Sequence, residues 1–311
     1  MTTSPAGEQF LDPAVLARVS NLELVARTVV EGFLSGLHRS PMIGSSTDFS
    51  DHRPYVPGDD IRRIDWRVFA RSERFYIKRY EAETNTNFVA LLDVSKSMRY
   101  GRKLEYGCIM AACLAYLASV QRDRVGMATF ASEIEDYVRP SARHLRQTLH
   151  ALDRASRNAT DGTPAAERRL MDVASKALPF EQLADPMRKR SMVVVISDLY
   201  EEPEKVAAAL DFVRGRGNDI AVFHVLDPRE IDFPFTDPGS FVDSESGERM
   251  PVIPDYLRDE YRRIIREHSA TLQRVLGERR VEYALFNTGQ PLDAALHAYL
   301  AVRKTFGRRR R

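Results

Sequence analysis

The chain has 311 residues, 43% of them hydrophobic, which is enough apolar material for one large domain or two ordinary ones. Lys and Arg number 46 against 44 Asp and Glu, a formal net charge of +2, so no strong overall field favours nucleic acid as a partner. The exception is the basic tail, residues 306–311, which ends in four consecutive arginines. We interpret it as a solvated chain end.

The cysteine and hydropathy patterns favour a reducing compartment. Cys108 and Cys113 lie five residues apart in an apolar helical stretch, so they point to different sides of the helix and favour neither a disulfide nor a metal clamp. No signal peptide is recognisable, and the longest apolar run, residues 109–120, is too short to cross a bilayer. We therefore expect a cytoplasmic protein without membrane insertion.

Residues 1–85 are predicted to form an N-terminal helix and a charged segment that packs on a main domain. Asp12 as the cap and Pro13 at the first helical position begin a helix whose apolar residues recur up to Gly36. Residues 37–60 are rich in Pro and Gly, which is typical of a loop.

The charged segment that follows contains the single Trp of the chain and a dense mixture of Asp and Arg. Its charges interleave with apolar residues, so part of the segment must be packed. We interpret it as a structural collar in which half-buried Asp–Arg pairs hold a loop against a core. The residues assigned to this collar are Tyr55, Asp59, Asp60, Arg62, Asp65, Trp66 and Arg71.

Five apolar residues, Phe88 to Leu92, then predict a strand buried on both faces. Asp93, Ser95 and Ser97 follow at the end of this strand, two residues apart. One carboxylate and two hydroxyls offer the hard oxygen ligands that suit an ion such as Mg²⁺ or Mn²⁺. In an open α/β sheet, ligands collect at the carboxyl ends of strands, so the position agrees with the chemistry.

A second strand of this kind, beginning at Met192, ends in Ser197 and Asp198. Strand and helix patterns alternate around these two strands, which predicts an α/β, Rossmann-like domain over residues 86–305, with a mostly parallel central sheet flanked by helices. The other expected elements are helices at 104–121, 141–152, 203–214, 254–276 and 292–304, and strands at 124–130, 134–138, 220–226 and 281–286.

The pattern D-x-S-x-S after an apolar strand resembles the metal-ion-dependent adhesion site (MIDAS) of von Willebrand factor type A domains. Such domains complete the site with an Asp, here Asp198, although the residue after it is often Gly and here is Leu199. They also add a loop threonine, for which the resemblance points to Thr163. Thr160 is a rival for that role, and a plain helix cap at Thr163 before Pro164 explains the same residues.

The segment beginning at Tyr55 carries the signature Y-x-P-G-D-D-x-R-x-I-D-W-x-x-x-A-R, which resembles the domain-of-unknown-function 58 (DUF58) family. The resemblance extends from about Asp12 to Tyr299. It implies a type A-like fold and association with MoxR-type AAA+ ATPases, and it implies no known enzymatic reaction. Longer relatives often carry transmembrane segments near the N-terminus, which we do not find here.

Motifs for the common enzyme classes are not found in the sequence. Neither a phosphate-binding glycine loop nor a G-x-S-x-G elbow occurs. Acid phosphatases of the haloacid dehalogenase type need a second Asp where this chain has Ser95. The histidines lack zinc-ligand spacing, and His224, inside a predicted strand, is interpreted as a core residue.

These observations predict a non-enzymatic, metal-dependent protein-interaction module in a chaperone-like or complex-assembly role. Asp93, Ser95, Ser97, Asp198 and Thr163 would hold Mg²⁺ or Mn²⁺ directly or through water, with one position open for a carboxylate from a partner. The resemblance names a MoxR-type ATPase as that partner. The alternatives are a metal-free structural scaffold and a hydrolase using a metal-bound water, for which the sequence offers no evident base.

Overall fold

The computed structural model describes residues 21–39, 51–56, 64–79, 86–160, 179–180, 190–242 and 247–308. The chain forms two compact units, one from residues 1–33 and 86–311 and the other from residues 34–85. The first division falls inside the N-terminal helix, between Phe33 and Leu34, so the larger part of this helix belongs to the main unit. In sequence, the second unit lies between that part and the first strand of the sheet.

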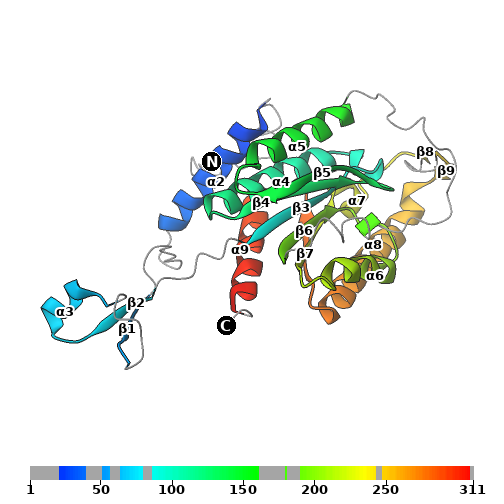
Figure 1. Ribbon diagram of the computed structural model, residues 1–311. Coiled ribbons are helices and arrows are strands. Elements are labelled where there is room, and N and C mark those ends of the chain that lie inside the picture. Colours follow the sequence, from blue (N-terminus) through cyan, green and yellow to red (C-terminus); the bar gives the residue numbers. More distant parts are fainter. Residues whose placement is uncertain are drawn as a thin grey trace, which may run out of the picture. The chain divides into compact units, whose positions relative to one another are not determined.

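The main unit is built on a six-stranded sheet with strand order β10-β7-β6-β3-β4-β5 (Figure 1). Every pair of neighbouring strands is parallel except β4 and β5, which are antiparallel. The α/β fold with a mostly parallel sheet is therefore confirmed, and β5 is one of its two edge strands. The strands are β3 (Asn87–Asp93), β4 (Arg124–Phe130), β5 (Ile134–Ser141), β6 (Ser191–Ser197), β7 (Asp219–Leu226) and β10 (Glu282–Asn287).

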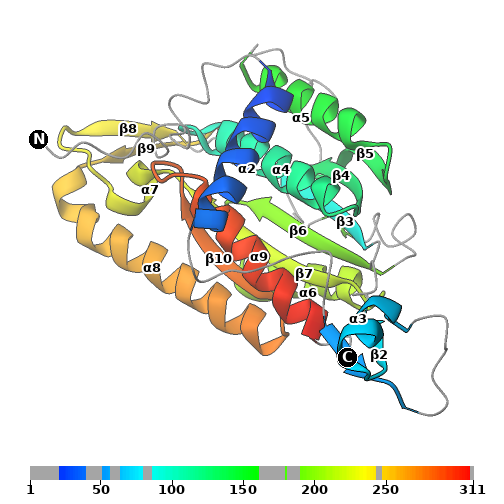
Figure 2. The same ribbon diagram turned by 90° about the vertical axis from the view of Figure 1, so that its left-hand side faces the viewer.

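Helices cover both faces of the sheet (Figure 2). On one face, α4 (Lys103–Val120) packs on β3 and β4, with α5 (Leu145–Thr160) and α9 (Asp293–Arg308) beside it. On the other face, α6 (Pro203–Arg214) and α8 (Pro254–Glu278) pack together over β7 and β10.

The central strands are apolar because they are buried on both faces. All seven residues of β3 and of β6 are buried. Val89 and Leu91 contribute to the core beneath α6 and α8, whereas Phe88 packs edge-to-face on Tyr299 of α9, with ring centroids 5.7 Å apart. A strand with one solvated face would alternate polar and apolar residues, so the continuous apolar run is the mark of a central strand.

Helix α4 is apolar on nearly every side for the same reason. By length and composition it could cross a membrane, but 78% of it is buried inside the fold, which is the position of a core helix. Cys108 and Cys113 are both free and fully buried within it, as expected.

Helix α2 (Leu22–Arg39) begins at Asn21, whose side chain accepts hydrogen bonds from two backbone amides of the first turn. One face of the helix is buried, including Val25, Val29, Val30 and Phe33. The Phe33 ring packs against His297 of α9, with ring centroids 4.7 Å apart. Residues 12–20 of the expected helix lie outside the described part of the chain.

A short helix and a hairpin follow β7. Helix α7 (Pro228–Asp232) precedes strands β8 (Gly239–Val242) and β9 (Arg249–Val252), which pair antiparallel. Two strands alone have little stability in water. Here Phe233, Phe235 and Phe241 pack their rings together, and Tyr261 of α8 packs on Phe233, so an aromatic cluster anchors the hairpin.

The second unit contains β1 (Asp51–Pro54), α3 (Trp66–Ser72) and β2 (Tyr76–Arg79), with β1 and β2 antiparallel. Strand β1 lies in the stretch that we expected to be a loop, so that expectation was wrong. Aromatic rings hold the unit together: Phe69 and Phe75 stack with centroids 4.4 Å apart, and Trp66 lies edge-on to both.

Candidate functional site

The candidate site lies at the carboxyl ends of the two central strands. β3 ends at Asp93, and the chain then turns through Ser95 into a short 3₁₀ helix that begins at Ser97. β6, the parallel neighbour of β3, ends at Ser197 and is followed by Asp198. Because neighbouring parallel strands have their carboxyl ends on the same side of the sheet, the two segments meet although about 100 residues separate them.

A chain of hydrogen bonds joins the side chains that the sequence analysis selected. Ser95 Oγ lies 3.0 Å from Ser97 Oγ, and Ser97 Oγ donates to Asp198 Oδ1 at 3.3 Å. The backbone amide of Ser95 donates to Asp93 Oδ1 at 2.8 Å. The structure therefore brings together four of the five predicted ligands. Thr163 lies outside the described residues, and its rival Thr160 is the last residue of α5.

Ser197 hydrogen-bonds the second carboxylate oxygen of Asp93. Its hydroxyl donates to Asp93 Oδ2 at 2.5 Å and accepts the backbone amide of Leu199 at 3.1 Å, so it ties the two strand ends together. Asp93 itself is only 4% exposed. Burial first, and then the charge of Asp198, raise the pKa of Asp93 to about 7, even though the hydrogen bonds from Ser197 and Ser95 oppose the shift.

A lysine that sequence reasoning missed lies beside these acids. Lys103, at the first turn of α4, is fully buried, and its Nζ donates to Asp198 Oδ2 at 2.7 Å and to Glu230 Oε1 at 2.6 Å. The ring of Tyr200 lies 4.9 Å from Nζ, within cation–π range. Asp198 thus bonds Ser97 through one oxygen and the ammonium through the other.

Glu230 extends the network to the end of β7. Its second oxygen accepts the backbone amide of Asp227 at 2.8 Å, while the side chain of Asp227 accepts the amide of Arg229 at 3.0 Å, which forms a capping box at the start of α7. Gly101, with φ of +61°, lies against Asp227, and a Cβ at Gly101 would approach Asp227 Oδ2 to 2.0 Å. The loop before α4 therefore requires glycine at this position.

His224 of β7 is a buried structural residue that contacts the backbone of the site. Its Nε2 lies 2.9 Å from the backbone oxygen of Asp198, and its Nδ1 lies 2.7 Å from the Tyr283 hydroxyl. Burial lowers the pKa of His224 to about 3, so the ring is neutral at physiological pH. The interpretation of His224 as a satisfied core residue is confirmed. Both ring nitrogens are engaged, so it does not offer a general base to the strand-end cluster.

The predicted collar residues belong to the second unit of the chain. Asp65 is buried, and its side chain accepts the amide of Val68 at 3.4 Å at the start of α3, so it acts as a helix cap. Trp66 is 57% exposed, whereas a collar held against a core would bury most of this ring. Tyr55 is half-buried, and Arg71 is exposed in the last turn of α3. Asp59, Asp60 and Arg62 lie outside the described residues. Packing of this unit on the main domain stays a prediction.

The fold and the strand-end cluster define a von Willebrand factor type A-like domain. Its parallel sheet is flanked by helices on both faces, and the Asp93-x-Ser-x-Ser segment leaves one central strand beside an aspartate from the next. The model of the family described as "Protein of unknown function DUF58" matches residues 51–271. The chain therefore belongs to the DUF58 family.

Relatives of this chain occur in mycobacteria. The chain is 30% identical over 270 residues to uncharacterized protein Rv1480 of Mycobacterium tuberculosis and to uncharacterized protein Mb1516 of Mycobacterium bovis, covering 85% of this chain and 82% of each relative. Among solved structures, an aerotolerance-related membrane protein of Bacteroides fragilis aligns at 15% identity with a TM-score of 0.45. The conserved hypothetical protein BatB of Bacteroides thetaiotaomicron aligns at 13% and 0.40. Each alignment covers 70% of this chain and 99% of the solved one.

Proposed function

We infer that this protein is a non-enzymatic protein-interaction module whose strand-end cluster binds Mg²⁺ or Mn²⁺. The observation that carries the proposal is the convergence of oxygen atoms from Asp93, Ser95, Ser97 and Asp198 at one edge of the sheet. Adjacent oxygens of an octahedral magnesium site, with metal–oxygen distances near 2.0–2.1 Å, lie about 2.9 Å apart. The separations of 3.0 Å and 3.3 Å along the Ser95–Ser97–Asp198 row approach that spacing.

The charges of the cluster also suit a divalent cation. Asp93, Asp198 and Glu230 carry three negative charges when ionised, and Lys103 carries one positive charge, which leaves a net charge of −2 in a buried setting. Lys103 bonds Asp198 through Oδ2, so Oδ1 stays directed at the serine hydroxyls. The residues of the cluster would hold the metal ion in place. The bound ion would then supply the positive charge that attracts an acidic side chain of a partner protein.

Such a site selects a partner that presents a carboxylate. The family resemblance makes a MoxR-type AAA+ ATPase the partner to test first, in a chaperone-like or complex-assembly role. Because the protein residues contribute hydroxyls and only two nearby carboxylates, they leave the ion electron-poor enough to attract a third one.

The experiment is binding of a purified MoxR-type ATPase to the full chain with magnesium or with EDTA. We expect binding with magnesium, and loss of binding with EDTA or on Asp93→Ala. Glu204→Gln, a charge-removing change at an exposed position of α6, is the matched control and should leave binding unchanged. Equal binding with and without EDTA would contradict a metal-dependent contact.

Lys103 favours a second candidate function, a metal-free scaffold. Its ammonium already neutralises part of the acidic cluster and ties three elements together, which is the role that a structural cation has elsewhere. Ligand binding to the native state raises stability, so magnesium should raise the melting temperature if the site binds the ion. A melting curve that is unchanged over millimolar magnesium would favour the scaffold.

A further inference from the structure

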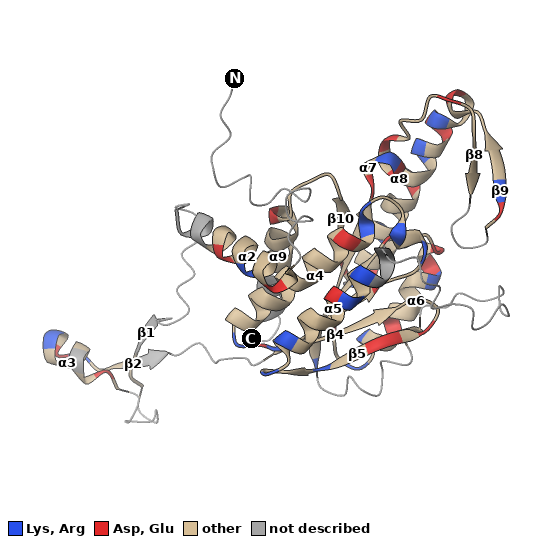
Figure 3. Ribbon diagram, turned by 90° about the horizontal axis from the view of Figure 1, so that it is seen from above, with Lys and Arg blue, Asp and Glu red and all other residues tan. Residues whose placement is uncertain are grey.

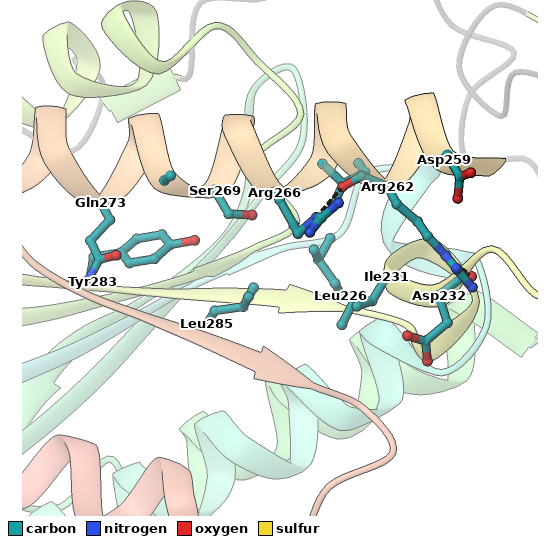
Figure 4. Close-up of a pocket in the computed structure, with 12 residues that line it drawn as sticks. Leu226, Ile231, Asp232, Asp259, Arg262, Arg266, Ser269, Gln273, Tyr283 and Leu285 are labelled. Carbon is teal, nitrogen blue, oxygen red and sulfur yellow. Dashed lines mark hydrogen bonds between the residues drawn. The ribbon is translucent and has the colours of Figure 1, made fainter. Parts of the chain in front are cut away.

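A groove separate from the strand-end cluster lies between helix α8 and the edge strand β10 (Figure 4). Its volume is about 660 Å³, within the range of ligand sites, which is roughly 300–1,000 Å³. Leu226 and Leu285 point into it from the sheet, Arg266 and Ser269 point into it from α8, and Ile231 of α7 lies at one end. The groove opens at the edge of the sheet.

The groove exists because α8 packs on the sheet through its C-terminal half. Leu272, Val275 and Leu276 are buried there, whereas the preceding turns of α8 have no buried residue until Pro254. The helix therefore diverges from β10 toward α7, and the wedge between them exposes 45% of Leu285. A helix of this length would ordinarily cover such a strand along its whole course.

Strand β10 presents an unpaired backbone edge at this groove. It is the last strand of the sheet and pairs only with β7 among the described residues. Its sequence, Glu-Tyr-Ala-Leu-Phe-Asn, contains no Pro or Lys and no bulge that would block pairing with another chain. On alternate residues its N–H and C=O groups point away from β7, which is the arrangement that strand addition uses.

The polar side chains of the groove are placed for a peptide as well. Arg262 and Arg266 each donate through Nε to a backbone oxygen, at 2.6 Å and 3.1 Å, and neither bonds a carboxylate in the described part of the chain. Other charged residues of α8, such as Arg263 with Glu260 and Glu267, pair with one another and are exposed. Figure 3 shows the basic and acidic positions along this helix in blue and red. Two guanidinium groups therefore remain available at the groove.

Further along, Ser269 Oγ is buried and makes no hydrogen bond within 3.5 Å among the described residues. Acids also line the groove: Asp232 and Asp259 lie at the end next to α7, whereas Arg266 and Ser269 lie in the middle. An anionic group would thus be favoured in the middle of the groove and disfavoured near α7.

We propose that this groove binds an extended peptide segment of a partner protein, which adds to β10 as a further strand. Its apolar side chains pack on Leu285, which is 45% exposed, and an acidic side chain bonds Arg266. The lining of α8 runs from Asp259 to Gln273, which corresponds to about 21 Å at 1.5 Å per residue. That length accepts about six residues of extended chain, which is also the length of β10.

The test uses the full chain and a phage-displayed library of random linear peptides as the probe, in EDTA. We expect enrichment of peptides in which apolar residues alternate and an acidic residue recurs at one position. Leu285→Lys should weaken the selected peptides about tenfold or more, as expected for a central contact. Arg266→Gln should reduce both affinity and its dependence on salt.

Ile264→Lys is the matched control, since Ile264 is 50% exposed on α8 but does not line the groove, and it should leave binding unchanged. Equal melting temperatures of the two lysine variants would show that Leu285→Lys is folded. Peptides that bind the Leu285→Lys variant as well as the wild type would overturn the proposal. A dimer that Leu285→Lys converts to monomer would also overturn it, because the occupant would then be a second copy. Since the selection contains EDTA, failure of the metal site would not alter its result.

Discussion

Removal of the buried ammonium of Lys103 is the sharpest perturbation of the strand-end cluster. Lys103→Met keeps a long apolar side chain beside Tyr200 but leaves Asp198 and Glu230 without the donor that each contacts, at 2.7 Å and 2.6 Å. Each charge-assisted hydrogen bond contributes about 1.5–3 kcal/mol. Breaking a buried ion pair by removing one partner costs about 3–5 kcal/mol, and we expect a loss of that size in the free energy of unfolding.

The assay is urea unfolding followed by far-ultraviolet circular dichroism, because the single Trp reports on the second unit instead. Glu230→Gln and the double variant complete a cycle. The double variant should lose less stability than the sum of the two single losses. Once Lys103 is Met, the Glu230→Gln change no longer breaks a contact with a buried ammonium. Arg263→Met on α8 is the control: its pairs with Glu260 and Glu267 are exposed and screened by solvent, so it should change the free energy of unfolding little. If Lys103→Met costs no more than Arg263→Met, the buried network does not stabilise the fold.

Two further predictions concern Asp93 and Trp66. Burial and Asp198 raise the pKa of Asp93 to about 7, above the unfolded value near 3.9, so the stability that its proton contributes is present below about pH 4 and is lost as the pH rises through 7. Without metal, the free energy of unfolding should therefore decline between about pH 4 and pH 7, and Asp93→Asn should flatten that decline. Parallel pH profiles for the two proteins would contradict the assignment. Trp66 is 57% exposed, so its fluorescence should resemble that of solvated indole and be quenched by iodide. A blue-shifted, protected emission would instead indicate that the second unit packs on another surface through Trp66.

Elements with a strong local pattern could be predicted from the sequence nearly to the residue. β4 and α6 have the expected bounds, 124–130 and 203–214, because an apolar run or a Pro-initiated amphipathic turn marks each one. Strand β1, Asp-His-Arg-Pro, has no apolar alternation, and it forms because β2 pairs with it. Helix α5 extends to Thr160, well beyond the expected end at residue 152. Its later turns are too polar for their periodicity to stand out.

The candidate site divides in the same way. Asp93, Ser95 and Ser97 are predictable because they lie within five residues of one another at the end of one apolar run. Asp198 is predictable because neighbouring parallel strands have their carboxyl ends on the same side of the sheet. Lys103 is not predictable, since its partners lie 95 and 127 residues away and a lysine at the start of a helix is usually solvated. The one available signal was its position directly before the long apolar run of α4.

Helix α2 has a consequence for how the protein is made. Its Phe33 packs on His297 of α9, which is synthesised much later than α2. At about 5–20 residues per second, roughly 15–50 s pass between the two. During that time the apolar face containing Val25, Val29 and Val30 lacks its C-terminal partner. The nascent chain is therefore expected to engage a holding chaperone at α2, and a chain truncated before α9 should aggregate through this same face.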